Sequence, residues 1–347
     1  MSNHQQTTPA IDHAAIMLAA RKLEQGALVA FPTETVYGLG GDAENPAAIA
    51  AIYAAKGRPA NHPVIVHVAP EADIGYWAAM VPVEARRLIA SFWPGPLTLI
   101  LKRAAHIPDA VAGGQDSVGL RCPAHPVAQA LLREFRGGKG GVAGPSANKF
   151  GHVSPTTAAH VREEFGDDAS SPLAYVLDGG QSEVGIESTI VDLSRIDTHG
   201  PVLLRPGQVT AAQIAAVLGM MPSSPDAGAP RASGTLDAHY APHTPVVQVE
   251  PADLGDVLQR LAHKGKQVAL IHHGPTDGTL RARRLMAAQA DEYAHDLYAA
   301  LRDMDHAGAD LIVIEAPPST AQWQGINDRL RRAAFDSQGM LARLLED

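Results

Sequence analysis

The sequence predicts an α/β protein made of two domains, each with its own sheet. Short apolar segments of strand-like composition alternate with alanine-rich segments of helical period along most of the chain. The chain has 347 residues, more than one hydrophobic core usually serves. Hydrophobic residues make up 46% of it and aromatic residues only 5%, so the core must consist mainly of Ala, Val, Leu and Ile.

The first domain is expected at residues 11–212, after a polar, flexible tail at residues 1–10. It should contain a mixed, twisted sheet. Strands are predicted at 27–31, 64–68, 97–101, 118–121, 142–144, 175–178 and 189–192, and helices at 11–24, 46–55, 83–92, 126–135 and 156–165. Asp12 and Ser154 occupy positions typical of helix caps, and Pro155 stands where the first turn after Ser154 would begin.

The second domain is expected at residues 246–347, after an interdomain linker at 213–245. The stretch from Gly219 to Pro245 holds five prolines and little apolar periodicity. Strands are then predicted at 246–249, 268–271 and 311–315, and helices at 254–263, 290–305 and 327–334. This rhythm indicates a smaller, Rossmann-like domain of ordinary size.

Composition excludes several classes of protein. No apolar run reaches the roughly 18 residues of a membrane span, and the N-terminus lacks a signal pattern, so we expect a cytoplasmic location. The single cysteine, Cys122, excludes an internal disulfide and a multi-cysteine zinc site. The net charge of −9 argues against a dedicated nucleic-acid-binding module, because phosphate neutralisation dominates such binding.

The segment from Ala27 to His67 is the most informative one. A buried strand runs into a turn rich in hydroxyls and glycine, a helix follows, and Lys56 and Arg58 stand beside a helix-breaking Gly and Pro. This arrangement is typical of a site for a phosphorylated ligand, with both cations projecting into one pocket. The alternative is a solvated helix end favoured by the helix dipole.

Other candidate motifs are weaker. Arg121 ends a strand suited to burial and needs a carboxylate partner, for which we favour a ligand over an internal acid. His67 ends an apolar strand, where a lone histidine is more often structural, and no cluster of metal ligands accompanies it. The chain has no P-loop, and its Gly38–Ala43 segment lacks the ribose-binding acid of a dinucleotide site.

An ordered series of motifs resembles the Sua5/YrdC family. The blocks are Pro32-Thr-Glu-Thr-Val-Tyr-Gly-Leu-Gly40, Lys56-Gly-Arg-Pro59, His62-Pro-Val-Ile-Val-His67, Phe92-Trp-Pro-Gly-Pro-Leu-Thr98, Val118-Gly-Leu-Arg-Cys-Pro123, Gly144-Pro-Ser-Ala-Asn148, Ser154-Pro-Thr156, Gly185-Ile-Glu-Ser-Thr-Ile-Val191, Leu204-Arg-Pro-Gly207 and His239-Tyr-Ala-Pro242. The segment Gly325–Ala334 resembles the end of the C-terminal domain in long, two-domain Sua5 proteins.

The resemblance implies a nucleotidyltransferase, an L-threonylcarbamoyladenylate synthase. Such an enzyme converts L-threonine, bicarbonate (or CO2) and ATP to threonylcarbamoyl-AMP and pyrophosphate. The product serves the N6-threonylcarbamoyladenosine modification of tRNA through a threonylcarbamoyl-transferase complex. Mg2+ is expected to travel with ATP rather than in a protein metal site, and a weak contact with RNA is left open.

The resemblance also assigns site residues. Lys56 and Arg58 would be catalytic. The threonine-binding residues would be Thr35, His67, Arg121, Gly144 and Ser188, and the ATP-binding residues Lys56, Arg58, His62, Ser117, Ser146, Asn148, Ser154, Arg205 and Tyr240. Tyr240 lies in the linker and is expected to stack on adenine and close the site over ATP; the alternative is that it only packs the linker onto one domain.

Two rival functions use the same fold. One is a double-stranded-RNA-binding or ribosome-assembly module, against which the acidic charge and the retained motif residues argue. The other is carbamoyl transfer to a different acceptor, against which the missing acylphosphatase and zinc-finger segments argue.

Overall fold

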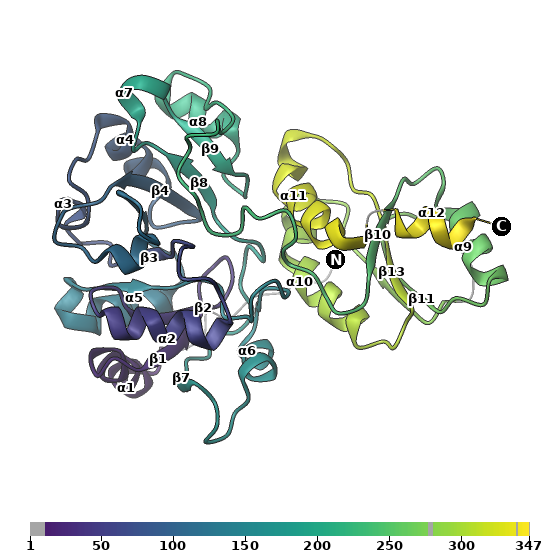
Figure 1. The fold of residues 1–347 in the computed structure, drawn as a ribbon, viewed down its shortest axis with the longest axis horizontal. Helices are drawn as coiled ribbons and strands as arrows, with labels where there is room; N and C mark the ends of the chain where they lie inside the picture. Colours follow the sequence, from purple (N-terminus) through teal and green to yellow (C-terminus); the bar gives the residue numbers. More distant parts are fainter. Residues whose placement is uncertain (1–10, 277–279, 338, 347) are drawn as a thin grey trace.

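The computed structural model describes residues 11–276, 280–337 and 339–346, and these form two α/β domains joined by a linker (Figure 1). The tail expected at residues 1–10 lies outside the described residues. Two domains of this class confirm the fold predicted from the sequence.

The N-terminal domain contains a nine-stranded sheet in the order β7-β1-β2-β6-β3-β5-β4-β8-β9. Its strands are β1 (Leu28–Phe31), β2 (Gly38–Asp42), β3 (Ile65–Val68), β4 (Leu97–Lys102), β5 (Ser117–Arg121), β6 (Gly141–Ala143), β7 (Leu173–Val176), β8 (Thr189–Asp192) and β9 (Val202–Arg205). The β3–β5 and β4–β8 pairs are parallel, whereas β1–β2 and β4–β5 are antiparallel, so the sheet is mixed as expected. Strand β2 was not predicted, because its Gly-Leu-Gly-Gly sequence is typical of a turn.

Helices cover both faces of this sheet. They are α1 (His13–Glu24), α2 (Pro46–Lys56), α3 (Ile74–Trp77), α4 (Val83–Phe92), α5 (Pro126–Glu134), α6 (Ala158–Phe165), α7 (Ile196–His199) and α8 (Ala211–Leu218), with the short 3-10 turns η1 (Asp109–Ala112) and η2 (Phe135–Gly138). Side chains alternate along β1: Leu28 and Ala30 belong to the core with α2, α4 and α8, while Val29 and Phe31 belong to the core with α1 and α5.

The linker covers another part of the second face. Ala229 and Ala232 pack against a small cluster of aliphatic side chains from β3, β4, β8 and β9. The domain boundary expected at residue 212 falls inside α8, whose Ile214 and Leu218 are buried in the core of the N-terminal domain. The expected linker therefore starts inside α8.

The C-terminal domain is built on four parallel strands in the order β10-β13-β11-β12. They are β10 (Val246–Val249), β11 (Val268–His272), β12 (Ala282–Leu285) and β13 (Leu311–Glu315). The helices are α9 (Leu254–His263), α10 (Ala290–Asp305), α11 (Gln324–Ala333) and α12 (Met340–Leu345), with the 3-10 turns η3 (Ala321–Trp323) and η4 (Phe335–Ser337). One core packs α9 against the sheet and the other packs α10 and α11.

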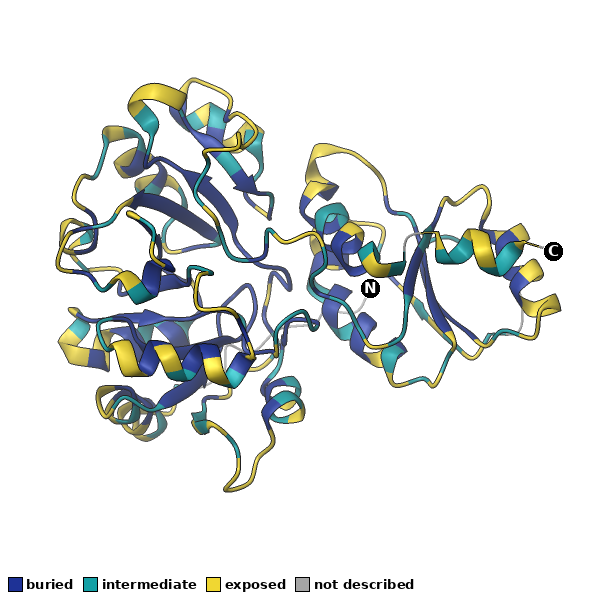
Figure 2. Ribbon diagram, viewed as in Figure 1, coloured by how far each residue is buried: buried dark blue, intermediate teal, exposed yellow. Residues whose placement is uncertain are grey.

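The face of the C-terminal domain with α10 and α11 meets the N-terminal domain (Figure 1). Its apolar core continues into Val36, Val153 and Ile186 of the first domain and into Tyr240 of the linker. Figure 2 accordingly shows buried segments on both sides of this junction. The interface is thus an extension of a core, which favours a fixed arrangement of the domains.

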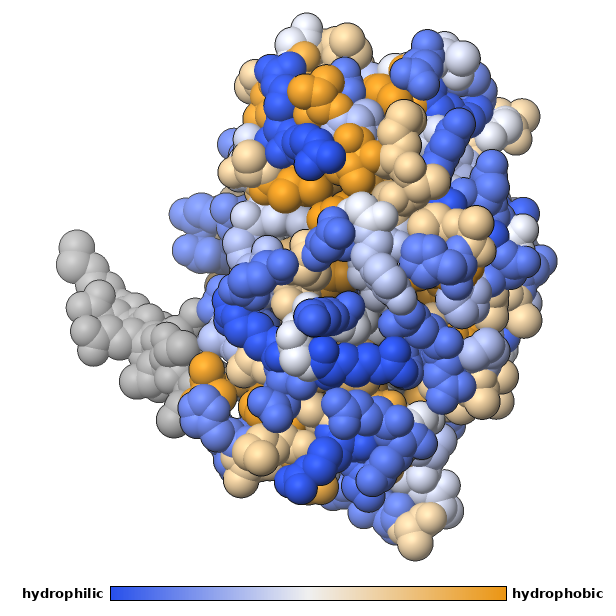
Figure 3. All heavy atoms as spheres, turned by 90° about the vertical axis from the view of Figure 1, so that its left-hand side faces the viewer, coloured by the Kyte–Doolittle hydropathy of each residue, from blue (hydrophilic) through white to orange (hydrophobic). Residues whose placement is uncertain are grey.

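The opposite, outward face of the N-terminal domain is largely hydrophilic (Figure 3). Apolar residues gather at the end that carries α4, α7 and α8, where Val83, Met220 and Met221 are exposed. No helix among residues 11–276, 280–337 and 339–346 is long and apolar enough to cross a membrane.

Candidate active site

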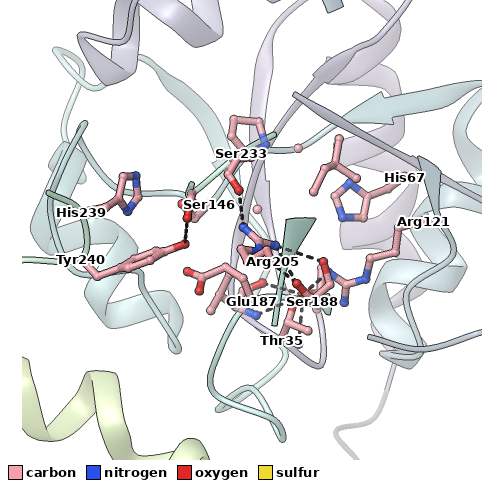
Figure 4. Close-up of a pocket in the computed structure, with 17 residues that line it drawn as sticks. Thr35, His67, Arg121, Ser146, Glu187, Ser188, Arg205, Ser233, His239 and Tyr240 are labelled. Atoms are coloured by element: carbon pink, nitrogen blue, oxygen red, sulfur yellow. Dashed lines mark hydrogen bonds between the residues drawn. The ribbon is translucent and has the colours of Figure 1, made fainter. Parts of the chain in front are cut away.

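A small cavity lies between residues of β3, β5 and β9, the loops beside them and the linker (Figure 4). It is lined by Thr33, Thr35, Val36, Gly38, Ile65, His67, Arg121, Gly144, Pro145, Ser146, Glu187, Ser188, Arg205, Ser233, Gly234, His239 and Tyr240. Its free volume is only about 30 Å3. A single water needs roughly 10–15 Å3 by the same measure, so the described conformation is closed.

All five residues expected to bind threonine line this cavity: Thr35, His67, Arg121, Gly144 and Ser188. Strands β3 and β5 present two of them, because His67 and Arg121 are register partners in this parallel pair and therefore point to the same face. The structure thus brings together every residue of the predicted threonine set.

His67 is buried, and its Nδ1 atom has no hydrogen-bond partner among the described residues. Burial, and after it the charge of Arg121, lowers the pKa of His67 to about 3, so the ring is neutral at physiological pH. Gly144 faces this ring: a Cβ atom there would stand 2.9 Å from Nδ1. Position 144 therefore requires glycine, because any side chain there would crowd the His67 ring. The Nδ1 atom of His67 is thereby left free for a ligand.

Arg121 has an internal carboxylate partner, contrary to our preference for a ligand carboxylate alone. Its Nη2 lies 2.6 Å from Oε1 of Glu34, and both side chains are buried. Its Nη1 donates to Oγ1 of Thr35 at 2.8 Å, and its Nε donates to the carbonyl of Gly95 at 3.2 Å. Glu34 therefore offsets the cost of burying this charge.

Ser188 and Arg205 form the opposite wall. Arg205 donates through Nε and Nη2 to the carbonyl of Ser188, at 3.0 and 2.9 Å, and through Nη1 to the carbonyl of Ser233 at 2.7 Å. The hydroxyl of Ser188 also contacts Oγ1 of Thr98 at 2.7 Å. Arg205 thus connects a residue of the threonine set with the linker.

Only part of the expected nucleotide set lines the cavity: Ser146, Arg205 and Tyr240 do so, whereas Lys56, Arg58, His62, Ser117, Asn148 and Ser154 do not. Ser117 begins β5 and Arg121 ends it, which separates them by about 13 Å at strand rise. His62 lies beside Phe150, with 5.7 Å between ring centroids.

Lys56 and Arg58 do not project together into the cavity in this conformation. The Nζ atom of Lys56 donates to the carbonyls of Ser146, at 2.6 Å, and Asn148. Arg58 donates to the carbonyl of Pro63 at 2.9 Å and contacts Oγ of Ser233 at 3.5 Å. Burial, and then the charge of Arg58, holds the pKa of Lys56 well below its ordinary value.

Ser154 does not cap a helix, contrary to the prediction. Helix α6 begins at Ala158 with Thr157 as its cap, whose side chain accepts from the amide of His160. The Oγ of Ser154 instead donates to Oε1 of Glu187 at 2.5 Å. Pro155 therefore belongs to the connecting segment, and no free helix amides stand at Ser154 for a phosphate.

Tyr240 is buried and has a backbone φ of 63°, rare for a residue with a side chain. Its ring faces Tyr298 of α10 at 5.7 Å between centroids and lies 5.6 Å from the guanidinium carbon of Arg329 of α11. Its hydroxyl lines the cavity and points to the carbonyl of Gly234 at 3.4 Å. Tyr240 therefore packs the linker onto the C-terminal domain, and its hydroxyl also reaches the cavity. Its stacking on adenine stays a prediction.

Comparisons with known proteins agree with this architecture. Residues 21–207 match the Sua5, YciO and YrdC family model, described as telomere recombination, and residues 209–335 match the model of the threonylcarbamoyl-AMP synthase C-terminal domain. The chain belongs to the Sua5/YrdC family. Because both models match, it belongs to the two-domain branch that the sequence motifs indicated.

Relatives of the same length support the assignment. Threonylcarbamoyl-AMP synthases of Pyrococcus abyssi and Bacillus subtilis are 37% and 39% identical, over 93% and 92% of this chain and 95% and 92% of their own. The crystal structure of the P. abyssi Sua5 protein in complex with L-threonine superposes with a TM-score of 0.84, covering 94% of this chain and 95% of that one at 35% identity.

Sequence reasoning missed several residues of the site. Glu34 and Glu187 both stand inside family motifs, and each is a carboxylate among residues suited to burial. That pattern could have identified them as partners of buried arginines. Arg329 also stands in a quoted segment, but no local pattern says that it reaches the first domain. Among the described residues, no group of three or more His, Cys, Asp or Glu side chains is arranged to hold a metal ion.

Proposed function

We propose that this protein is an L-threonylcarbamoyladenylate synthase, a nucleotidyltransferase that uses L-threonine, bicarbonate or CO2, and ATP. The threonine amine captures CO2 and loses a proton, giving a carbamate. A carbamate oxygen then forms a bond to the α-phosphorus of ATP, the bond from that phosphorus to the bridging oxygen breaks, and pyrophosphate leaves. The protein contributes positioning and charge stabilisation rather than a covalent intermediate.

The observation that carries this proposal is the composition of the closed cavity. It combines Arg121, a neutral histidine with a free ring nitrogen, and the hydroxyls of Thr35 and Ser188. These groups suit the carboxylate, amine and hydroxyl of a small amino acid. A relative of the same architecture is known in complex with L-threonine, which supports the same ligand for this chain.

ATP is proposed to bind on the side of the linker, near Arg58, Ser146 and Arg205. A triphosphate here would displace the contact between Arg58 and Ser233 and give Lys56 an anionic partner, which would raise its depressed pKa. Mg2+ would enter with the triphosphate. The cavity is smaller than a nucleotide, so residues 231–240 are proposed to move outward to admit ATP and to close again over it.

The product is proposed to pass to a tRNA threonylcarbamoyl-transferase complex in the cytoplasm. Threonylcarbamoyl-AMP is a mixed anhydride and hydrolyses readily, so a buried site with a moving linker would both protect it and release it. The acidic surface charge favours this role over RNA binding as the main activity.

The test is pyrophosphate release by the full chain with each substrate omitted in turn. We expect release to require ATP, bicarbonate and threonine together, and serine to replace threonine poorly. Release that is unchanged without threonine or without bicarbonate would refute the proposal.

A further inference from the structure

A carboxylate from the first domain stands between the cavity and the second domain. Glu187 lines the cavity and is 7% exposed. Its Oε1 accepts the hydrogen bond of Ser154, and its Oε2 accepts from the hydroxyl of Tyr298 at 2.8 Å and from Nε of Arg329 at 3.0 Å. Two of its three side-chain partners therefore come from the C-terminal domain.

Arg329 is fully buried, with an exposed fraction of 0%. Besides the Glu187 carboxylate, it pairs with the Asp328 carboxylate at 3.1 Å. It also donates to the carbonyl of Glu187 at 3.0 Å and to the carbonyl of Pro206 at 2.6 Å. It does not line the cavity but stands directly behind residues that do. A guanidinium buried this deeply needs carboxylate partners, and Arg329 has two. Glu187 depends on Arg329 more strongly, because it forms no other salt bridge among the described residues.

Close contacts hold the Glu187 segment against α10 and α11. A Cβ atom at Gly185 would lie 2.3 Å from the carbonyl oxygen of Ala294, so only glycine allows the backbones to approach this closely. Gly325 of α11 packs on Gly207 in the same way, with 3.1 Å from a built Cβ to the Gly207 Cα. The position of Glu187 is thus set by the C-terminal domain.

The charge of Glu187 matters because the proposed substrates are anions. Arg121 is already paired with Glu34, whereas Arg205 forms no salt bridge in the described part of the chain. Without Arg329, the Glu187 carboxylate would keep its hydrogen bonds from Ser154 and Tyr298 but would have no salt bridge. Its charge would then repel phosphate and cancel the charge of Arg205. Burial works to raise the pKa of Glu187, but Arg329 and then Arg205 outweigh it and lower the pKa to about 2, so the group stays ionised.

We propose that Glu187 is a positioning residue of the active site and that Arg329, supplied by the C-terminal domain, neutralises it so that the cavity can bind an anionic nucleotide. The inference rests on the proposed function. It assigns the second domain an electrostatic part in substrate binding, through an ion pair that spans the two domains.

The test measures ATP affinity and pyrophosphate release between pH 6 and 8 in the full chain. In Arg329→Met, the Kd for ATP should rise by about tenfold to a hundredfold, the effect of one uncompensated nearby charge. The affinity should also fall further as pH rises, because the unpaired Glu187 then ionises. Adding Glu187→Gln to Arg329→Met removes the charge and should recover most of the affinity and abolish the new pH dependence.

Two further variants separate charge from packing. Arg329→Lys keeps the charge but cannot reproduce all the bonds that the guanidinium makes to backbone carbonyls, so it should bind ATP far more tightly than Arg329→Met. Arg302→Met removes another buried arginine of the interface, one that bonds to the Val153 carbonyl and to Glu164, and should give no new pH dependence. Equal losses of ATP affinity in Arg329→Met, Arg329→Lys and the double variant would overturn the inference. A wild-type chain that releases no pyrophosphate would instead overturn the proposed function.

Discussion

Gly234 offers a direct way to perturb closure of the linker. It has a φ of +71°, in the left-handed region, and a Cβ atom built on it would lie 2.0 Å from Oη of Tyr240 and 2.8 Å from Nη1 of Arg205. The substitution Gly234→Ala therefore conflicts with the closed conformation in two ways, through backbone strain and through a clash with two residues of the site.

The effect of Gly234→Ala on closure can be calculated from the backbone strain alone. Left-handed backbone costs a residue with a Cβ about 1–2 kcal/mol. If the open linker relieves that strain, closure becomes less favourable by the same amount, which corresponds to about fivefold to thirtyfold in the closing equilibrium. We expect ATP affinity to fall by up to this factor, while the melting temperature falls only slightly because the ligand-free chain can open its linker and relieve the strain.

The assay is ATP binding by calorimetry with pyrophosphate release measured in parallel. Gly228→Ala is the matched control, since this linker glycine has no left-handed φ and its nearest contact is the flexible end of Arg195. ATP affinity and turnover of Gly234→Ala within about twofold of the control would refute the claim that substrates are held in the closed conformation.

Three other predictions follow from the site. Arg58→Ala should abolish pyrophosphate release and ATP binding with the fold intact by circular dichroism; retained ATP affinity would remove Arg58 from the phosphate site. Arg121→Lys keeps a charge for Glu34 but loses the planar fork, so the KM for threonine should rise by about tenfold to a hundredfold and that for ATP far less, and the reverse pattern would show a wrong assignment. His67 has its pKa lowered from 6.5 to about 3, so the unfolded chain binds a proton that the folded chain does not, and stability is lost as pH falls below about 6.5. Urea denaturation should therefore show that the free energy of unfolding falls between pH 7 and pH 5, and that this fall is about 2 kcal/mol smaller in His67→Gln than in wild type. An equal fall in both proteins would mean that His67 is not buried in its neutral form.

The regular elements were predictable because their side-chain patterns are local. The predicted bounds of α9, α10, β10 and β13 match the structure, since each has a clean apolar period and ends at turn residues. Strand β2 was missed because its glycines give no apolar pattern in the sequence. They are buried all the same, because β2 lies between β1 and β6 in the sheet. Helix α8 was absorbed into the linker because a proline-rich stretch follows it closely.

The site was predictable only in part, because its contacts join distant segments. The motif residues around His67 and Arg121 were found, since β3 and β5 carry them side by side. The partner of Arg121 is 87 positions away at Glu34, and the partner of Glu187 is in another domain at Arg329. Such pairings depend on tertiary packing, and no local sequence pattern predicts them. The same holds for Ser154, whose hydroxyl bonds to Glu187 instead of capping α6.

The most direct test of the central claim is to follow the carbon of bicarbonate. The full chain is incubated with ATP, Mg2+, threonine and 13C-labelled bicarbonate, and the nucleotide products are analysed by mass spectrometry. The expected product is a threonylcarbamoyl-AMP that carries the label, formed together with an equal amount of pyrophosphate. Formation of AMP and pyrophosphate with no labelled adduct at any early time, or of a labelled product that lacks threonine, would contradict it.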